Sequence, residues 1–481
     1  MARLSLGKIG FSLIFVTSLS AAFLSSASAE EKGNASESSD ENILGELIVS
    51  GTVKEHFAKV AILKSNSALY EDVVVRNVVR KDLDLSGMFR LIPDSKAPPG
   101  AYGFNDPVDI KAWQALGAEA MVKVAARSAK NGKVEVLGLA YFPSAGKEPV
   151  YKTTLVVSKS NVRKTAHQIT DDLLGALTGR PGGFSSRFAF SGPWGRNQRV
   201  FTADADGHGL APRSELKSAS IGPAFGPHGA LYYSRSKNYA PYRIQYRALA
   251  TDELFHLSLP FKGSVYSLAF DKEKKRLAVA VAENGGSAIY VGDADGSKME
   301  RVSKTKLATH PTFAPDGKLA WVGGSPERGS QRIFVDGKAV SPGAFTAAAP
   351  TFCDTEDGTF LVYAVGVGGG RQDLVMSSPT GKGLTRLTQN QGSNSYPACS
   401  PDGRLLAFFS TRKSEKGLYV LSLKRWTTKK ILGRVGESLR WEPLPREELT
   451  RETAAPGSPA QSSHTAHQSS GPACGLAPGP T

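Results

Sequence analysis

Residues 310–317 read HPTFAPDG, and this octapeptide decides the fold because the chain repeats it. Residues 222–229 read GPAFGPHG, residues 396–403 read YPACSPDG, and weaker copies centre on Phe270, Phe352 and Trp441. A second, β-rich motif alternates with the first and begins near Val200, Ile244, Ile289, Ile333, Leu374 and Leu418. Both markers recur about every 44 residues, six times each, so chance is a poor explanation.

A period of roughly 40–50 residues is typical of one four-stranded antiparallel propeller blade. Pro-Asp-Gly suits the tight turn of a blade, because proline fixes φ and glycine accepts positive φ. The sequence therefore predicts a six-bladed β-propeller over residues 185–443. The two markers are out of phase, since the first β-rich run precedes the first aromatic motif. A strand at 439–441 should thus complete the blade begun by strands at 187–190 and 200–203, which removes the open edges of the ring.

Residues 44–184 mix strand and helix periodicities and predict a small α/β domain. Apolar residues between Leu69 and Leu85 form one helical stripe, and those from Ala166 to Leu177 form another that Gly179 ends. Asp109 can cap a short helix that contains Trp113. Strands are expected at 47–49, 60–63, 120–126, 134–142 and 153–158.

The two ends of the chain do not follow these patterns. Two basic residues precede an apolar run at 9–24, and the small residues at 27–29 follow it, which predicts a secretory signal peptide of residues 1–29, cut after Ala29. The polar, acidic stretch 30–43 reads as a flexible leader. Residues 444–481, rich in Pro, Ser, Ala, Thr and Gly, read as a disordered tail. The mature protein is expected to be exported and soluble.

Charge and cysteine content narrow the classes of partner. The 481-residue chain has a formal net charge of +15, which allows long-range attraction to acidic partners but names none. Nucleic acid is not expected as a partner, because export separates the protein from it and the basic residues do not cluster with aromatic ones.

Three cysteines are too few, and odd in number, to form a disulfide framework. Cys399 stands at an aromatic position of the repeat, which favours a buried apolar thiol, although a bridge to Cys353 stays open.

Several motifs that suggest chemistry have a simpler interpretation. The two Asp-Ala-Asp-Gly segments at 204–207 and 293–296 lack the further ligands of a calcium loop and fit hairpin turns. His464 and His467 have helical metal-ligand spacing, but the tail is not expected to fold around zinc. The chain contains no Gly-x-Ser-x-Gly elbow and no His-Glu-x-x-His motif. We therefore expect no catalytic residue, no metal site and no cofactor.

Three segments of the α/β region resemble one family closely. Residues 82–89 read DLDLSGMF, residues 113–120 read WQALGAEA, and residues 177–184 read LTGRPGGF at the domain junction, where His167 and Asp171 precede the last of them. With the propeller repeats after them, in this order, they resemble the TolB family of the Tol–Pal cell-envelope system. The resemblance covers nearly the whole mature chain to about residue 443.

The resemblance implies a non-enzymatic, monomeric periplasmic adaptor that supports outer-membrane integrity and envelope constriction during cell division. TolB proteins bind Pal, a peptidoglycan-associated lipoprotein, over one mouth of the propeller, which makes them peripheral to the outer membrane. Their mature N-terminal segment contacts TolA, an inner-membrane protein. The residues of this chain at the expected Pal-binding mouth are Ser264, Ser267, Thr309 and His310.

A different class of function stays open from the sequence. Some propellers are hydrolases or lactonases with an axial metal site, and these need Asp, Glu, Asn or His side chains from several blades at the central channel. The repeats do not display such a set, and metal analysis of the purified protein would separate the two classes.

Overall fold

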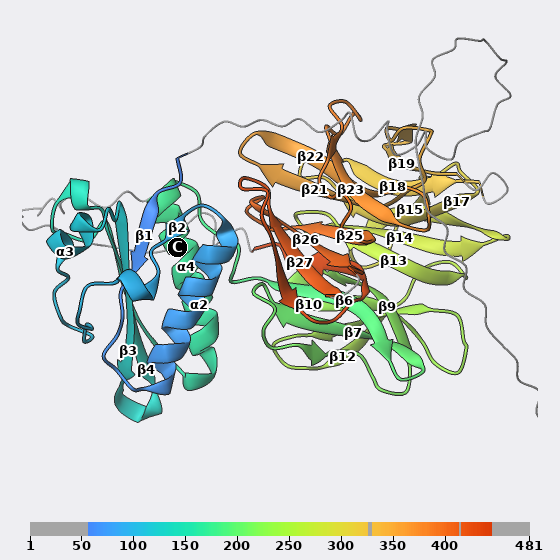
Figure 1. Ribbon diagram of the computed structural model, residues 1–481. Coiled ribbons are helices and arrows are strands. Elements are labelled where there is room, and N and C mark those ends of the chain that lie inside the picture. Colours follow the sequence, from blue (N-terminus) through green and yellow to red (C-terminus); the bar gives the residue numbers. More distant parts are fainter. Residues whose placement is uncertain (1–55, 326–329, 413–414, 445–481) are drawn as a thin grey trace, which may run out of the picture.

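The computed structural model describes residues 56–325, 330–412 and 415–444. The predicted signal peptide, leader, strand at 47–49 and C-terminal tail lie outside these residues. Two units lie side by side, an α/β unit and a ring of β-sheets (Figure 1). Within the described ranges, no helix is both long and apolar enough to cross a membrane.

The α/β unit is built on one five-stranded sheet with the order β2-β1-β3-β4-β5. β1 pairs in parallel with β2 and β3, and the remaining pairs are antiparallel. The strands are β1 (Lys59–Ile62), β2 (Arg90–Leu91), β3 (Ala120–Ser128), β4 (Val134–Tyr141) and β5 (Tyr151–Val157). The helices are α2 (Tyr70–Ser86), α3 (Ile110–Ala115) and α4 (Val162–Thr178), with short 3-10 turns at Asp94–Lys96, Lys130–Gly132, Pro143–Ala145 and Lys159–Asn161.

The helices cover both faces of this sheet, as the alternation of its side chains requires. α2 and α4 pack on the face that carries Val60, Val122 and Val124. On the other face, Trp113 of α3 joins Ala61 and Met121. Asp109 caps α3 as predicted, because its Oδ1 accepts from the Ala112 amide at 3.1 Å.

The second unit consists of six four-stranded antiparallel sheets, which confirms the predicted propeller. We number the blades in chain order and name the blade that closes the ring last. Within each blade, the strands are given from the one nearest the axis to the outermost. Blade 1 is β9 (Ala219–Phe225), β10 (Ala230–Ser236), β11 (Arg243–Ala248) and β12 (Leu254–Leu257), with a 3-10 turn at Pro227–Gly229; blade 2 is β13 (Ser264–Phe270), β14 (Arg276–Glu283), β15 (Gly286–Asp293) and β16 (Glu300–Arg301); blade 3 is β17 (Leu307–Phe313), β18 (Leu319–Gly324), β19 (Gln331–Val335) and β20 (Lys338–Ala339). Blade 4 is β21 (Ala347–Thr355), β22 (Gly358–Gly366), β23 (Gln372–Ser377) and β24 (Thr385–Arg386); blade 5 is β25 (Asn394–Cys399), β26 (Leu405–Ser410), β27 (Gly417–Ser422) and β28 (Thr428–Leu432); the closing blade is β29 (Glu437–Trp441), β6 (Arg187–Trp194), β7 (Asn197–Asp204) and β8 (Ala211–Pro212).

The ring closes as the repeat phase predicts. β29 pairs antiparallel with β6, with Trp441 opposite Phe188 and Arg440 opposite Ala189. The Trp441 ring lies 4.4 Å from the Phe188 ring between centroids, and its indole N–H donates to Ser186 Oγ at 2.8 Å. The C-terminal strand therefore joins the first part of the propeller to the last and leaves no open seam.

The innermost strand of every blade carries a register shift against the second strand, close to the position three residues before its aromatic residue or the equivalent one. In β13 the shift falls at Tyr266, one residue earlier than in the other five blades. We call the residues three positions before the aromatic one the axial residues: Gly222, Ser267, His310, Ala349, Tyr396 and Ser438. Five of the six have positive φ. A bulge bends the strand and redirects side chains, so it shapes the wall of the central channel.

The favoured interpretation of Cys399 as a buried free thiol is wrong. Cys353 of β21 and Cys399 of β25 form a disulfide, with their Cα atoms 5.3 Å apart. Sequence spacing could not show this, because the pairing depends on how blades 4 and 5 stack side by side.

Candidate functional site

The four residues predicted at the propeller mouth lie on two neighbouring innermost strands, β13 and β17. Three of them are linked: the His310 amide donates to Ser267 Oγ at 3.2 Å, and His310 Nδ1 lies 2.7 Å from Thr309 Oγ1. Ser264, at the start of β13, accepts from the Tyr242 amide at 2.9 Å. Ser267 is buried, whereas the other three are half-buried. The structure thus brings Ser267, Thr309 and His310 together across blades 2 and 3, whereas Ser264 contacts blade 1.

An exposed aromatic side chain stands among them that the sequence analysis missed. Tyr266 lies at the register shift of β13, between Val265 and Ser267, and is 42% exposed. Its ring lies 6.0 Å from that of Tyr242, between centroids. The repeat alignment contained the signal, because Tyr266 precedes Phe270 by four residues just as Thr309 precedes Phe313.

The axial residues include four polar side chains, those of Ser267, His310, Tyr396 and Ser438, and no acidic one. His310 lies opposite Tyr396, with ring centroids 6.0 Å apart. Burial, helped by the charge of Arg440, lowers the pKa of His310 to about 4, so this imidazole is neutral at pH 7. The six axial residues include one histidine and no carboxylate. This set does not fit the ring of metal ligands that a propeller hydrolase or lactonase would need.

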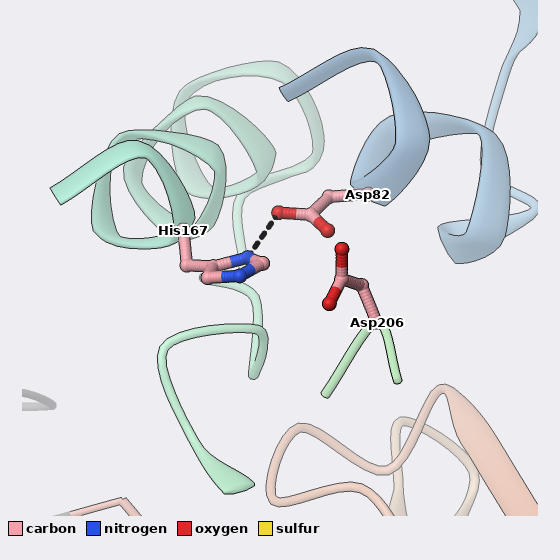
Figure 2. Close-up of side chains that lie close together, drawn as sticks. All are labelled: Asp82, His167 and Asp206. Carbon is pink, nitrogen blue, oxygen red and sulfur yellow. Dashed lines mark hydrogen bonds and ion pairs between the residues drawn. The ribbon is translucent and has the colours of Figure 1, made fainter. Parts of the chain in front are cut away.

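A second polar site joins the α/β unit to the closing blade. His167 of α4 and Asp82 of α2 are buried and hydrogen-bonded, with Nδ1 2.6 Å from Oδ2. Asp206 follows β7 and points toward the same pair (Figure 2). Arg163, one turn before His167, binds Asp204 at 2.9 Å and also pairs with Asp206. We call these five residues the junction cluster.

The junction cluster clarifies the first Asp-Ala-Asp-Gly segment. It forms the predicted turn, since the Gly207 amide donates to the Asp204 carbonyl at 2.8 Å. Asp206 is also 1% exposed and contacts two helices, whereas Asp295 of the second copy is exposed and bonds only within its own turn. Sequence alone treated both copies alike.

Electrostatics in the cluster favour a charged histidine. Burial opposes the imidazolium, but the negative charges of Asp82, Asp206 and Asp204 and the hydrogen bond that His167 donates to Asp82 outweigh it and raise the pKa of His167. Burial likewise acts against the Asp206 carboxylate, yet its contacts with Arg163 and His167 lower its pKa overall. Each carboxylate therefore faces a cation of the neighbouring elements.

Three residues of the junction cluster are spaced closely enough to hold a metal ion. Asp82, His167 and Asp206 offer ligand atoms within 4.8 Å of one another, and Asp82 Oδ1 and His167 Nε2 have no hydrogen-bond partner in the part of the chain that the structure describes. Arg163 and Lys81 already bind Asp206, however, Lys81 Nζ lying 3.5 Å from its carboxylate and donating to its carbonyl at 2.8 Å. A divalent cation would have to displace these fixed charges, so the geometry fits an ion-pair network between domains.

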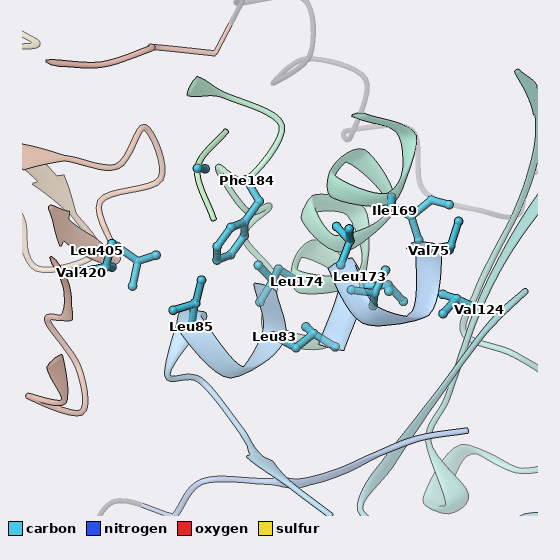
Figure 3. Packing of buried hydrophobic residues seen from close by; sticks show 14 of the residues in the cluster. Val75, Leu83, Leu85, Val124, Ile169, Leu173, Leu174, Phe184, Leu405 and Val420 are labelled. Carbon is cyan, nitrogen blue, oxygen red and sulfur yellow. The ribbon is translucent and has the colours of Figure 1, made fainter. Parts of the chain in front are cut away.

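Apolar packing continues across the same junction. Phe184, in the segment between α4 and β6, is 2% exposed and belongs to one cluster with Leu85 and Leu174 of the helices and Leu405 and Val420 of blade 5. Figure 3 shows its ring between the helices and the propeller strands. The α/β unit and the propeller therefore share a hydrophobic core.

Asp171 holds the junction segment in place. This buried carboxylate accepts from the amides of Phe184 and Ser185 at 2.7 and 2.8 Å. Burial raises its pKa to about 7 despite these hydrogen bonds. His167 and Asp171 lie one helical turn apart on α4. His167 faces Asp206 after β7, and Asp171 binds the segment that leads into β6. These contacts give a physical reason for the presence of both residues in the motif at the domain junction.

Comparison with known proteins agrees with this architecture. Residues 48–137 match the family described as the TolB amino-terminal domain. The chain is 26% identical over 248 residues to the protein TolB homolog of Chlorobium chlorochromatii, covering 51% of this chain and 55% of that relative. It is 30% identical over 156 residues to the Tol-Pal system protein TolB of Polaromonas naphthalenivorans, covering 32% of this chain and 35% of that one. The aligned stretches thus span between about a third and about half the length of these relatives.

The crystal structure of TolB from Acinetobacter baumannii matches with a TM-score of 0.67 at 22% identity and covers 81% of this chain and 98% of that chain. At this identity the structural match establishes the fold. Together with the sequence matches, it confirms the resemblance that the three motifs indicated. The chain therefore resembles TolB: residues 48–137 match the TolB amino-terminal domain, and residues 187–441 form a six-bladed β-propeller.

Proposed function

We propose that this protein is a non-enzymatic periplasmic adaptor of the Tol–Pal system that docks a Pal-like lipoprotein on its propeller. The observation that carries the proposal is the match of residues 48–137 to the TolB amino-terminal domain, together with a closed propeller in which the predicted contact residues lie on the adjacent strands β13 and β17. Through this contact it would be peripheral to the outer membrane and support envelope integrity and constriction during division.

The mouth has the properties of a docking surface for a folded protein. Backbone hydrogen bonds within the blades and the linked side chains of Ser267, Thr309 and His310 hold it rigid, so little conformational entropy is lost on binding. Tyr266 supplies an exposed aromatic ring beside them, and tyrosine is enriched among the residues that dominate binding energy. We propose Tyr266 as the anchor of this interface, with Thr309 and Ser264 at its edge.

The chemistry of the channel supports the non-enzymatic part of this proposal. The axial residues offer a neutral histidine and no carboxylate, so they supply neither an acid–base pair nor a metal ligand set. We also propose that residues 30–43 contact a TolA-like inner-membrane protein after export. The leader lies outside the described residues, and the resemblance alone supports this part.

Calorimetry tests the docking proposal. The mature protein is titrated with the Pal-like lipoprotein domain of its own organism at tens of micromolar, and we expect saturable binding. Tyr266→Ala should weaken it by at least about tenfold, or about 1.4 kcal/mol, as for an aromatic anchor. Trp426→Ala is the matched control, because Trp426 is 49% exposed in the β27–β28 turn, away from the mouth. Binding that is absent, or unaffected by Tyr266→Ala, contradicts the proposal.

A further inference from the structure

The innermost strands end at a cavity on the face opposite the proposed docking mouth. β13 begins at Ser264 on the mouth side and ends at Phe270, which lines a cavity of about 330 Å³. The ends of the innermost strands of all six blades and the segment Arg180–Gly182 before β6 surround it. No part of the proposed adaptor function uses this cavity.

Arg440 of β29 lines the cavity and is an uncompensated cation. Its guanidinium makes one long contact, from Nη2 to the Pro311 carbonyl at 3.4 Å. No carboxylate among residues 56–325, 330–412 and 415–444 lies within ion-pair distance of it. Burial lowers the pKa of Arg440 to about 10, and no neighbouring anion offsets this effect. The group nevertheless stays charged at pH 7.

Lys274, from the turn between β13 and β14, lines the same cavity. Its ammonium donates to the Phe225 carbonyl at 2.9 Å and forms no direct ion pair with a described carboxylate. Burial lowers its pKa to about 8, although the charges of Asp271 and Glu442 act in the opposite direction. Two basic groups, one from blade 2 and one from the closing blade, thus line the same cavity without a dedicated counter-charge.

The acidic residues around the cavity are already engaged. Asp271 accepts from the amides of Lys275 and Arg276, at 2.8 and 3.0 Å. Asp402 pairs with Arg404 at 3.0 Å. Asp354 lies 3.7 Å from Lys272 and accepts from Thr359. The positive charge of Arg440 and Lys274 is therefore left for a ligand.

We propose that this cavity is an anion-binding site that takes a carboxylate or phosphate group between Arg440 and Lys274. A guanidinium binds either group through parallel N–H donors, and the attraction is stronger at a partly buried site than in bulk water. The anion has two possible sources. One is a small free anion, and the other is the chain itself, since Glu447 and Glu448 follow closely after Pro443 and Leu444, which line the cavity.

The test measures binding of inorganic phosphate to the full mature chain at pH 7 and low salt, by calorimetry and by thermal denaturation. Arg440→Gln is the test variant. Arg196→Gln is the matched control, because it removes the same charge from an exposed turn between β6 and β7. A third chain, with Glu447→Gln and Glu448→Gln, removes the intramolecular competitor.

We expect phosphate to bind and to raise the melting temperature of the parent and of Arg196→Gln, with an affinity at least about tenfold lower in Arg440→Gln. Binding seen only in the chain without Glu447 and Glu448, and lost again when Arg440→Gln is added, assigns the site to the chain's own carboxylates. Phosphate that binds no chain, or binds Arg440→Gln as well as Arg196→Gln, overturns the proposal. Without ligand, Arg440→Gln should melt no lower than the parent, since it removes an uncompensated charge. A lower melting point would instead assign Arg440 a structural role at Pro311.

Discussion

Removal of the Cys353–Cys399 disulfide should destabilise the propeller measurably. The bond joins β21 of blade 4 to β25 of blade 5 across 46 residues of sequence. Substitution of both residues by alanine removes the cross-link without placing an unpaired hydroxyl in the core, where Cys353 is fully buried. The double variant Cys353→Ala/Cys399→Ala is therefore the cleanest perturbation.

The size of the effect follows from the length of the closed loop. In the chain-entropy model, a cross-link over a loop of this length restricts the unfolded chain by about 4 kcal/mol. Measured disulfide contributions are commonly about 2–4 kcal/mol, because the unfolded state retains some structure. We expect the double variant to lose a free energy of unfolding in this range.

Urea unfolding followed by far-ultraviolet circular dichroism measures this loss, with reduced parent protein as a second arm. Cys474→Ala is the control, since Cys474 lies in the tail and should leave the bridge intact. Thiol titration in urea should find one free thiol in the oxidised parent and three after reduction. Three thiols before reduction, or identical urea midpoints for the oxidised parent and the double variant, would refute the reasoning.

Three further changes probe the junction and the blade turns. Because folding raises the pKa of His167, its contribution to stability is full below about pH 6.5 and is lost as the pH rises through the folded-state pKa. The urea midpoint of the parent should therefore fall between about pH 6 and 9, and His167→Gln should make this fall smaller. An unchanged dependence of the midpoint on pH would contradict this. Phe184→Ala opens the shared core and should cost about 3–5 kcal/mol in urea unfolding, whereas a loss below about 1 kcal/mol would mean that the two units do not share a core. Gly403 has φ +72°, and a Cβ there would overlap the Asp354 carbonyl, whereas Gly229 has φ +64° and no neighbour within 4 Å of a Cβ. Gly403→Ala should therefore lower the melting temperature more than Gly229→Ala. Equal melting temperatures would show that the backbone around Gly403 shifts to accommodate the methyl group.

The repeat explains why so much of the fold could be predicted. Each Pro-Asp-Gly turn and the aromatic before it act within one blade, over residues close in sequence, so local pattern was enough to predict the blade. Trp441 lies far from Phe188 in sequence, yet the phase of the markers still predicted their pairing. The helices at Tyr70–Ser86 and Val162–Thr178 followed from their apolar stripes in the same way.

The polar sites depended on contacts that no local pattern encodes. Asp206 and Asp295 occupy the same turn of the repeat, and only the first meets a helix of the α/β unit. Arg440 reads in sequence as one more basic residue on a strand, and only closure of the ring places it at a cavity where no described carboxylate lies within ion-pair distance of it. Tyr266 could have been found by aligning the repeats more strictly.

The sequence by itself determined the number of blades, the closing strand, the order of the two units and the resemblance to TolB. All of these rest on periodicity and short motifs, which depend on neighbouring residues. Only the tertiary structure decided which side chains meet: the disulfide between blades, the junction cluster of Asp82, Arg163, His167, Asp204 and Asp206, and the basic cavity around Arg440. The physical reason is that charge pairing, burial and cross-linking depend on distances between residues that lie tens to hundreds of positions apart, and packing alone sets those distances.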